Sequence, residues 1–300
     1  MSYADLHLHS TASDGTLDPA ALVREVVGRG ARGLALTDHD TMAGLAEAEA
    51  EAHRLGLAWL PGCEVSATAD GASVHLLAYG MAEGTGALAA LLTEIREDRR
   101  ARARAIVRRF NELGVPLEWE AVARESVGDV PTRAHVARAI VDSGLMADVQ
   151  EVFMRYLGDG GPAYVEKAVV EPQVVFDAVH EAGGVVVLAH PGHSFTDERI
   201  VEWSRQGLDG IEVMHPKNRG QRRDELRALA YRLDLLSTGG SDWHGTTGGG
   251  MEPGTERVPL EWMEAIAARC GGSLDPTTPG RPAPSGGPTP SDTKRPTELE

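Results

Sequence analysis

Short clusters of histidine and acidic residues recur along almost the whole chain, and most of them follow an apolar run. Imidazole and carboxylate groups are costly to bury at such positions unless they are paired or bound to a metal. They are also the ligands that divalent first-row metals prefer. The pattern therefore predicts a site for several metal ions. The clusters are Asp5-Leu-His-Leu-His, Thr37-Asp-His-Asp, Gly62-Cys-Glu, Val74-His, Ala189-His-Pro, Glu212-Val-Met-His and Ser241-Asp-Trp-His.

Not every histidine fits this pattern. The chain has 11 histidines, and His53 and His180 lie inside amphipathic helical segments, away from any strand end. We expect these two to be ordinary helix residues. In His7-Leu-His9, by contrast, the two side chains leave an extended strand on the same face, because strand side chains alternate with period two.

Between the clusters, apolar strand-like runs alternate with helical segments. Such alternation favours an α/β fold with a parallel sheet or barrel, whose ligands gather at the carboxyl edge of the strands. Asp18-Pro19 is typical of a helix start, with an N-cap residue followed by proline. The expected strands are 33–37, 58–61, 73–79, 185–189, 210–214 and 235–238, and further helices are expected at 43–55, 173–182, 198–205 and 221–233.

The middle of the chain breaks the alternation, because every segment from about 86 to 158 looks helical. A long helix is expected over 91–113, ended by Gly114. It carries a run of seven arginines, which is typical either of a solvated helix face with acids nearby or of an access surface for a phosphate-rich substrate. These arginines are Arg96, Arg99, Arg100, Arg102, Arg104, Arg108 and Arg109.

These patterns divide the chain into three parts. Residues 1–99 and 166–272 are expected to form a discontinuous metal-binding barrel, with residues 100–165 as a helical insertion that caps it. The stretch 273–300 is rich in Pro, Gly, Ser and Thr, and cannot bury enough apolar surface to become ordered.

Composition narrows the range of partners. A net charge of −16 argues against binding duplex DNA, although metals and arginines can still receive an anionic substrate. Two cysteines imply no disulfide framework. No apolar run approaches the roughly 18 residues of a membrane span, and the first motif lies too near the start for a signal peptide. We therefore expect a cytoplasmic protein without a membrane role, and no obligate protein partner is evident.

Taken together, the motifs resemble those of the PHP family, the polymerase and histidinol phosphatase domains. They are Asp5-Leu-His-Leu-His-Ser with Asp14-Gly, Leu36-Thr-Asp-His-Asp, Gly62-Cys-Glu-Val-Ser, Ala189-His-Pro-Gly, Gly210-Ile-Glu-Val-Met-His-Pro and Thr238-Gly-Gly-Ser-Asp-Trp-His-Gly. The resemblance covers about residues 3–270. It is greatest to a stand-alone bacterial branch that removes the 3′-phosphate of nucleoside 3′,5′-bisphosphates and trims 5′ ends of RNA. It implies a distorted (β/α)7 barrel with a helical insertion.

The resemblance also implies two to three divalent ions, commonly Mn²⁺, with Fe²⁺ and Zn²⁺ as alternatives. A first ion would take His7, His9, Glu64 and Asp242; a second would share Glu64 and add His75 and His190; a third would take Asp14, His39 and His244. Of these, the carboxylates Glu64, Asp14 and Asp242 are expected to be catalytic, with Glu64 bridging two ions. Closely spaced ions can generate hydroxide at neutral pH.

Several polar groups beside these ligands are expected to support them or to contact substrate. Asp5, Asp38 and Asp40 are expected to orient imidazoles. His215 and Asn218 are candidate substrate contacts. Two positions depart from the family pattern: His193 stands where Arg is common, and Lys217-Asn218 where Ser-His is common.

In the insertion, Pro131-Thr-Arg-Ala-His resembles a segment that lies over the site in the related branch. An arginine beside the free N–H groups of a helix start is a favourable anion site, so Arg133 is the predicted phosphate anchor. A surface salt bridge is the alternative for Arg133. His135 is expected either to contact substrate or only to pack.

Three functions follow from these residues. The first is a metal-dependent phosphoesterase acting on nucleotides or short single-stranded RNA. The second is a histidinol-phosphate phosphatase, which the insertion bearing Arg133 disfavours. The third is a non-catalytic metal-stabilised module, against which all nine ligand positions argue, since each holds a ligand-type residue.

Overall fold

The computed structural model describes residues 2–81, 86–126, 128, 130–245 and 251–274. Within them, seven strands form the wall of a barrel in sequence order. The predicted distorted (β/α)7 barrel is thus confirmed. The strands are β1 (Tyr3–Asp5), β2 (Gly33–Leu36), β3 (Ala58–Ala69), β4 (Ala72–Tyr79), β5 (Val185–Leu188), β6 (Gly210–Met214) and β7 (Leu236–Gly239).

The chain beyond β1 closes the barrel against the chain that follows β7. Leu6 N donates to Gly239 O over 3.1 Å, and Asp242 N donates to His7 O over 2.9 Å. Leu8 also pairs in parallel with Trp243. The first and last ligand motifs of the sequence therefore become neighbours. A short strand, β8 (Val258–Pro259), pairs antiparallel with β1 outside this closure.

The wall is not wholly parallel, which corrects the expectation of a parallel sheet. β4 runs antiparallel to both β3 and β5. β3 is also far longer than the predicted strand 58–61, because it continues to Ala69 and forms a hairpin with β4. An apolar run marks a strand but not its direction, and a two-residue turn at Asp70-Gly71 reverses this one.

Side chains alternate across the wall. On β3 and β4, Cys63, Val65, Val74 and Leu76 face the outer helices. Leu60 and Leu77 face inward, where they pack with inward residues of other strands and with α10 (Leu260–Arg269). Because strand side chains alternate, Glu64 shares the inner face with Leu60, and His75 shares it with Leu77. The barrel interior is thus apolar at the α10 end and polar at the other.

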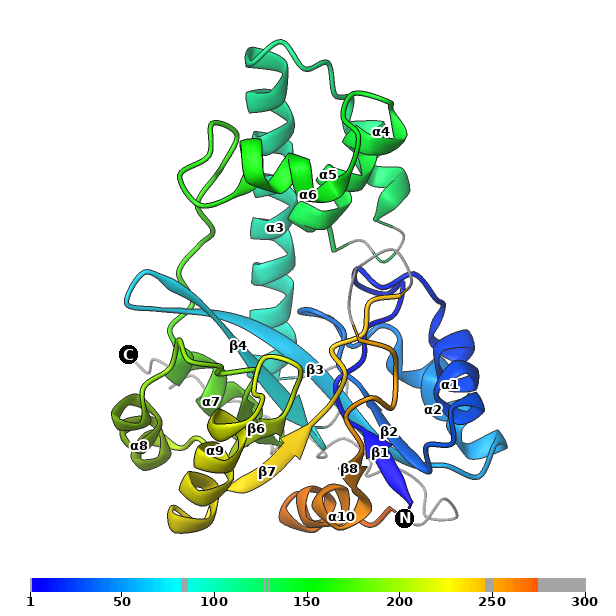
Figure 1. The fold of residues 1–300 in the computed structure, drawn as a ribbon, viewed down its shortest axis with the longest axis vertical. Coiled ribbons are helices and arrows are strands. Elements are labelled where there is room, and N and C mark those ends of the chain that lie inside the picture. Colours follow the sequence, from blue (N-terminus) through cyan, green and yellow to red (C-terminus); the bar gives the residue numbers. More distant parts are fainter. Residues whose placement is uncertain (1, 82–85, 127, 129, 246–250, 275–300) are drawn as a thin grey trace, which may run out of the picture.

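Helices cover the outside of the wall (Figure 1). On the β1–β3 side, α1 (Pro19–Gly28) and α2 (Leu45–Arg54) pack in one apolar cluster. On the β3–β7 side, a second cluster is formed with α7 (Pro172–Glu181), α8 (Asp197–Gln206) and α9 (Gln221–Arg232). The predicted Asp18 cap is confirmed, since its carboxylate accepts from Ala21 N over 2.6 Å.

One long helix, α3 (Gly86–Glu112), rises from the barrel into a separate helical lobe (Figure 1). Its first turns pack on the barrel through Leu88, Leu92 and Ile95. Its later turns pack through Ile106 and Phe110 into a distinct apolar cluster in the lobe. The lobe also holds α4 (Trp119–Glu125), α5 (Arg133–Asp142), α6 (Val149–Val152) and a π-helix, η1 (Phe153–Leu157).

The change of packing partner along α3 falls near residue 99, although the helix itself is continuous. The boundaries 1–99, 100–165 and 166–272 stay a prediction, and the tail 273–300 lies outside the described residues after 274. None of the described helices is both long and apolar enough to cross a membrane.

Candidate metal centre

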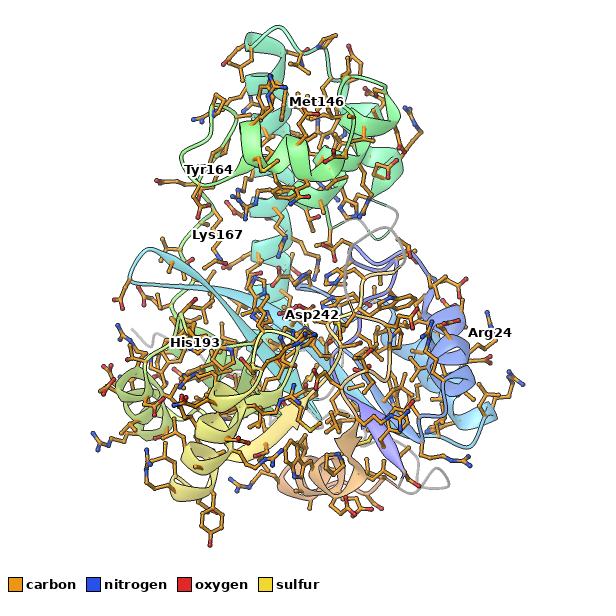
Figure 2. All side chains as sticks on the ribbon, in the orientation of Figure 1. Arg24, Met146, Tyr164, Lys167, His193 and Asp242 are labelled. Carbon is orange, nitrogen blue, oxygen red and sulfur yellow. The ribbon has the colours of Figure 1, made fainter. Side chains whose placement is uncertain are left out.

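The nine predicted ligands come together at the polar end of the barrel. They are carried by the chain after β1, β2, β5 and β7, by β3, and by the start of β4. His75 is near the beginning of its strand, yet it reaches the same end as the others because β4 is antiparallel. Asp242 lies at the centre of the molecule, below the lobe (Figure 2).

Glu64 is fully buried at the middle of this group. Its Oε1 lies 2.9 Å from His75 Nδ1 and 3.0 Å from His190 Nε2. Its Oε2 faces other imidazoles, with His39 Nδ1 at 3.0 Å and His9 Nε2 at 3.2 Å. The two oxygens of one carboxylate thus serve two sets of histidines, as a residue shared between two ions requires.

Ligand-type atoms gather in overlapping groups. His7, His9, Glu64 and Asp242 form one group, whose ligand atoms all lie within 4.8 Å of one another. A second holds His39, Glu64 and His75, with His190 adjacent through Glu64. These groups overlap the sets expected for the first and second ions.

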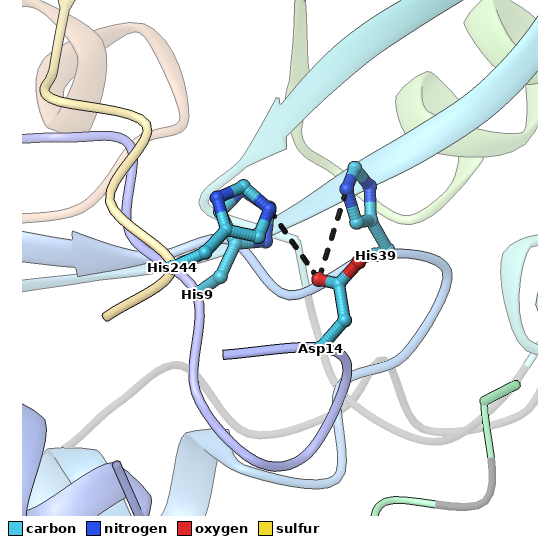
Figure 3. A group of neighbouring side chains, drawn as sticks. All are labelled: His9, Asp14, His39 and His244. Atoms are coloured by element: carbon cyan, nitrogen blue, oxygen red, sulfur yellow. Dashed lines mark ion pairs between the residues drawn. The ribbon is translucent and has the colours of Figure 1, made fainter. Parts of the chain in front are cut away.

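The third group holds His9, Asp14, His39 and His244 (Figure 3). Asp14 Oδ1 lies 3.4 Å from His244 Nε2 and 4.0 Å from His39 Nε2, and the rings of His9 and His244 stack at 4.0 Å. Except for the additional His9, this is the set expected for a third ion.

The unsatisfied atoms of the site fit a cation. Within the described residues, several buried nitrogen and oxygen atoms of these ligands have no hydrogen-bond partner. They include His7 Nε2, His9 Nε2, His39 Nδ1, Asp14 Oδ1 and Glu64 Oε2. Leaving such atoms buried without a partner is expensive, and they are mixed imidazole nitrogens and carboxylate oxygens, which suit divalent first-row metals. The residues present therefore fit metal ions.

The electrostatics agree with this fit. Although burial raises the pKa of Glu64, the facing imidazoles of His39 and His75 bring it well below its usual value. Burial lowers the pKa of His75 and of His244 to about 4, so both imidazoles are neutral near pH 7. Burial also opposes protonation of His9, but Asp242 and Glu64 raise its pKa to about 10. A bound cation would replace such a proton.

Backbone strain is concentrated at the same end of the barrel. His190 and Asp242, both predicted ligands, have positive φ angles of 28° and 54°, and Asp40 has one of 53°. Left-handed backbone is unfavourable for non-glycine residues and persists only where surrounding contacts enforce it. The backbone therefore turns sharply just after these strands, and the turns direct the ligand side chains toward the metal centre.

The carboxylate that orients the His7 imidazole is Glu212, to which the sequence analysis assigned no role. It is fully buried, and its Oε1 lies 2.9 Å from His7 Nδ1 while its Oε2 accepts from His190 N over 2.6 Å. One inward carboxylate on β6 thus holds two predicted ligands. The sequence offered one signal for this role: Glu212 lies in the apolar strand that starts at Gly210, and alternation places its side chain on the inner face.

Asp5, Asp38 and Asp40 do not hydrogen-bond to any imidazole among the described residues, which corrects their expected role. Asp5 accepts from the backbone of Ser241 and Gly254. Asp38 accepts from the hydroxyls of Ser10 and Ser13.

Asp40 accepts from Ser66 and pairs with Arg99 Nε over 2.5 Å. The three aspartates are short side chains beside strand ends, so they reach backbone amides and hydroxyls before they reach a ring.

The predicted substrate contacts have different surroundings. His135 is buried near Asp14 and accepts at Nδ1 from Thr132 N over 3.0 Å. His215 is buried beside Asp242, with its Nε2 3.3 Å from the carboxylate.

Asn218 is buried, with its side chain between Gly192 N and Glu212 O. This points to positioning of the turn after β5 in place of the expected substrate contact. His193 and Lys217, the two departures from the family pattern, are exposed.

Arg133 starts α5, where Thr132 caps the helix as predicted from Thr-Arg. Its Nη1 donates to Leu157 O and lies 3.5 Å from Asp159, whose side chain is 89% exposed. Such an exposed ion pair contributes little to the free energy of folding. The expected salt bridge is therefore present but weak, and the guanidinium also lies near the rings of Phe153 and Tyr164.

The PHP domain family model matches residues 5–164 of the sequence. The chain belongs to the PHP family. A 5′-3′ exoribonuclease of Haemophilus influenzae is 34% identical over 80% of this chain and 89% of the relative. A 3′,5′-nucleoside bisphosphate phosphatase of Chromobacterium violaceum is 35% identical over 86% of this chain and 93% of the relative.

A solved PHP-like structure agrees. A protein of Bifidobacterium adolescentis, provisionally assigned as a metal-dependent phosphoesterase, matches with a TM-score of 0.84 at 31% identity, over 89% of this chain and 96% of that one. This PHP protein is accordingly a hydrolase of phosphate esters, which argues against the non-catalytic alternative.

The role of Glu212 can be tested by Glu212→Gln, which keeps the shape but turns one oxygen into a donor. That amide cannot accept from both His7 and His190, so we expect the apparent Mn²⁺ affinity to fall about 10- to 100-fold with the fold intact. Mn²⁺ titration with circular dichroism measures this. Glu202→Gln, on the exposed face of α8, should leave affinity unchanged; equal affinity in both variants would contradict the role.

Proposed function

We propose that this PHP protein is a metal-dependent phosphoesterase that removes the 3′-phosphate of nucleoside 3′,5′-bisphosphates and also trims the 5′ ends of short single-stranded RNA. The observation that carries the proposal is Glu64, whose two oxygens face separate sets of histidines beneath a lobe bearing cationic side chains. The substrates named for the relatives support the nucleotide class.

We further propose two to three divalent ions, Mn²⁺ first and Fe²⁺ or Zn²⁺ as alternatives, held by the nine ligands in the sets given above. Glu64, Asp14 and Asp242 are the proposed catalytic carboxylates. When bound, such ions supply a hydroxide nucleophile and stabilise the charge on the phosphoryl group. The protein contributes the ligands and holds them in place.

Two imidazoles near the proposed ligands accept a backbone N–H group at Nδ1. His135 accepts at Nδ1 from Thr132 N, so its neutral ring carries the proton on Nε2. Burial lowers its pKa to about 4, which keeps it neutral at pH 7. His215 accepts at Nδ1 from Lys217 N over 3.0 Å, and its Nε2 faces the Asp242 carboxylate over 3.3 Å. We assign the Nε2–H group of His135 to a phosphoryl oxygen of the substrate and propose that His215 positions Asp242.

Substrates with one or few phosphates fit the charge of the chain. The net charge of −16 opposes long duplexes, while Arg133, whose ion-pair partner Asp159 is exposed, can still receive a phosphate. Nucleotides and short single strands are therefore the proposed partners.

The function is tested by phosphate release from adenosine 3′,5′-bisphosphate, histidinol phosphate and 5′-phosphorylated RNA, each with and without Mn²⁺. We expect turnover of the bisphosphate to disappear on chelation and to return with Mn²⁺, with histidinol phosphate much slower. Full activity of the chelated protein would contradict the metal requirement. Preferential turnover of histidinol phosphate would assign the second function instead.

Arg133 is proposed to bind the phosphate that is not cleaved. Losing a charge-assisted hydrogen bond of about 1.5–3 kcal/mol should lower kcat/KM for the bisphosphate roughly ten- to a hundredfold in Arg133→Ala, and should hardly affect a 3′-monophosphate. Arg155→Ala, at an exposed pair in the same lobe, is the matched control. Equal losses on both substrates would place Arg133 at the cleaved phosphate or in the fold.

A further inference from the structure

We infer that Arg133 does not act alone, and that Arg102, Arg133 and Lys167 around the ring of Tyr164 form a second phosphate site. We call these four residues the waist cluster. The inference deepens the proposed function and rests on it: a phosphate ester is hydrolysed at the metals while another phosphate of the same substrate binds here.

The waist cluster lies where the lobe joins the barrel. Arg102 comes from α3 and Arg133 from the start of α5, while Tyr164 and Lys167 belong to the segment that returns to α7 (Figure 2). The guanidinium carbons of Arg102 and Arg133 lie 5.7 and 5.9 Å from the centroid of the Tyr164 ring. Three separate parts of the chain thus bring their cations to one place.

These cations are poorly neutralised. Within the described part of the chain, Arg102 has no carboxylate within ion-pair distance; its Nε donates to Val165 O over 2.7 Å. Lys167 donates to Ala67 O over 2.6 Å and to Ser73 Oγ over 2.8 Å, and also has no carboxylate partner there. Among the described residues, the carboxylate within ion-pair distance of Arg133 is that of the exposed Asp159.

Arg99, one turn before Arg102, shows the contrast, because its charge is matched by Asp40. Burial, together with Arg99, Arg102 and Arg133, lowers the pKa of Lys167 to about 8, and Asp40 only partly opposes this. Half-buried like charges are unfavourable together unless an anion joins them.

Polar side chains on the β3–β4 hairpin lie between the waist cluster and the metal centre. Ser73, which binds Lys167, precedes His75 by two residues and so lies on the same strand face, about 7 Å further along. Across the hairpin, Thr68 faces Ser73, and its Oγ1 is buried without a partner. The free hydroxyl and the three cations lie on the lobe side of the ligands.

A phosphate suits this arrangement because it offers several acceptor oxygens and up to two negative charges. The terminal amino groups of Arg102 make no hydrogen bond to another described residue, so they are available as donors. The bound group is either the 5′-phosphate of the attacked nucleotide or the next phosphodiester of a strand. Tyr164 offers a ring face beside it.

The structural alternative is that these cations only tether the returning segment. Arg102 binds Val165 O, Arg109 binds Tyr164 O, and Lys167 binds the β3 backbone. A tether would affect all substrates alike. A phosphate site would affect only substrates with a second phosphate.

The experiment compares Lys167→Gln, Lys167→Arg and Arg102→Gln with Arg108→Gln, an exposed arginine of α3 outside the cluster. Steady-state kinetics with saturating Mn²⁺ use three substrates: a nucleoside 3′,5′-bisphosphate, a nucleoside 3′-monophosphate and a trinucleotide without a 5′-phosphate. We expect Lys167→Gln and Arg102→Gln to raise KM for the bisphosphate about tenfold or more, with small changes in kcat. Lys167→Arg and Arg108→Gln should stay close to the wild type.

The other two substrates identify the phosphate. Unchanged kinetics on the monophosphate and the trinucleotide would assign the site to the 5′-phosphate, whereas a raised KM on the trinucleotide, which keeps one uncleaved phosphodiester, would assign it to the next phosphodiester. Equal losses on all three substrates, or none on any, would overturn the site in favour of the tether.

A pH series adds a readout that a tether would not change. Lys167 loses its charge as pH rises through about 8, so the ratio of kcat/KM for the bisphosphate to that for the monophosphate should fall above this pH. Any titration of groups at the metal centre affects both substrates and therefore cancels in this ratio. Guanidinium groups such as those of Arg99 and Arg102 do not deprotonate in proteins, so they do not produce the fall. In Lys167→Arg the fall should vanish; an identical fall there would contradict the role.

Failure of the proposed function would look different. If the wild type hydrolysed no nucleotide, calorimetric binding of the 3′,5′-bisphosphate to the Mn²⁺-loaded protein would still decide the site. Binding weakened by Lys167→Gln but not by Arg108→Gln would support it, and equal binding in both variants, or none to the wild type, would overturn it.

Discussion

The buried carboxylate of Glu64 is the interaction on which the functional end of the barrel depends. An isolated charge at that depth would be strongly unfavourable, but four surrounding imidazoles within about 3 Å stabilise it and bring the pKa of Glu64 well below its usual value. Unpartnered nitrogens of His7 and His9 remain beside it. Divalent ions would satisfy carboxylate and imidazoles together, so folding and metal binding are coupled here.

The barrel places this carboxylate by simple alternation. Inward positions on β3 and β4 are apolar toward α10, as at Leu60 and Leu77, and turn polar toward the lobe, as at Glu64 and His75. The chain after β1 pairs with the chain after β7, and this pairing brings the first and last ligand motifs next to Glu64. The lobe, carried on α3, brings cations to the side of the ligands, three of which are carboxylates: Asp14, Glu64 and Asp242. This separation lets an acidic protein receive an anionic substrate.

Much of this could be predicted from sequence, because apolar runs ending in ligand-type residues mark strand ends whatever the tertiary context. The direction of β4 could not, since its apolar run reads equally in both directions. Pro61-Gly62 is typical of a strand end, but β3 continues to Ala69 because its residues from Gly62 onward pair with β4. The short β8 and helix α10 were also missed, because their pairing is with distant parts of the chain.

Roles that depend on reach across the barrel were the hardest to predict. Asp40 stands beside His39 in sequence but binds Ser66 and Arg99, whereas Glu212, far from His7 in sequence, orients that ring. The difference between the arginines of α3 became apparent only once the helix was placed: Arg99 pairs with Asp40 of the barrel, whereas Arg102 has no carboxylate within ion-pair distance among the described residues.

The sharing of Glu64 between two ion positions is the central claim, and metal content tests it most directly. Wild-type protein and Glu64→Gln are loaded with Mn²⁺, freed of excess metal and analysed by elemental mass spectrometry, with His180→Gln, on the outer helix α7, as the control. The account predicts two to three ions per chain in the wild type and the control, and the loss of at least two in folded Glu64→Gln. Retention of the full metal content in Glu64→Gln, or the loss of a single ion, would contradict it.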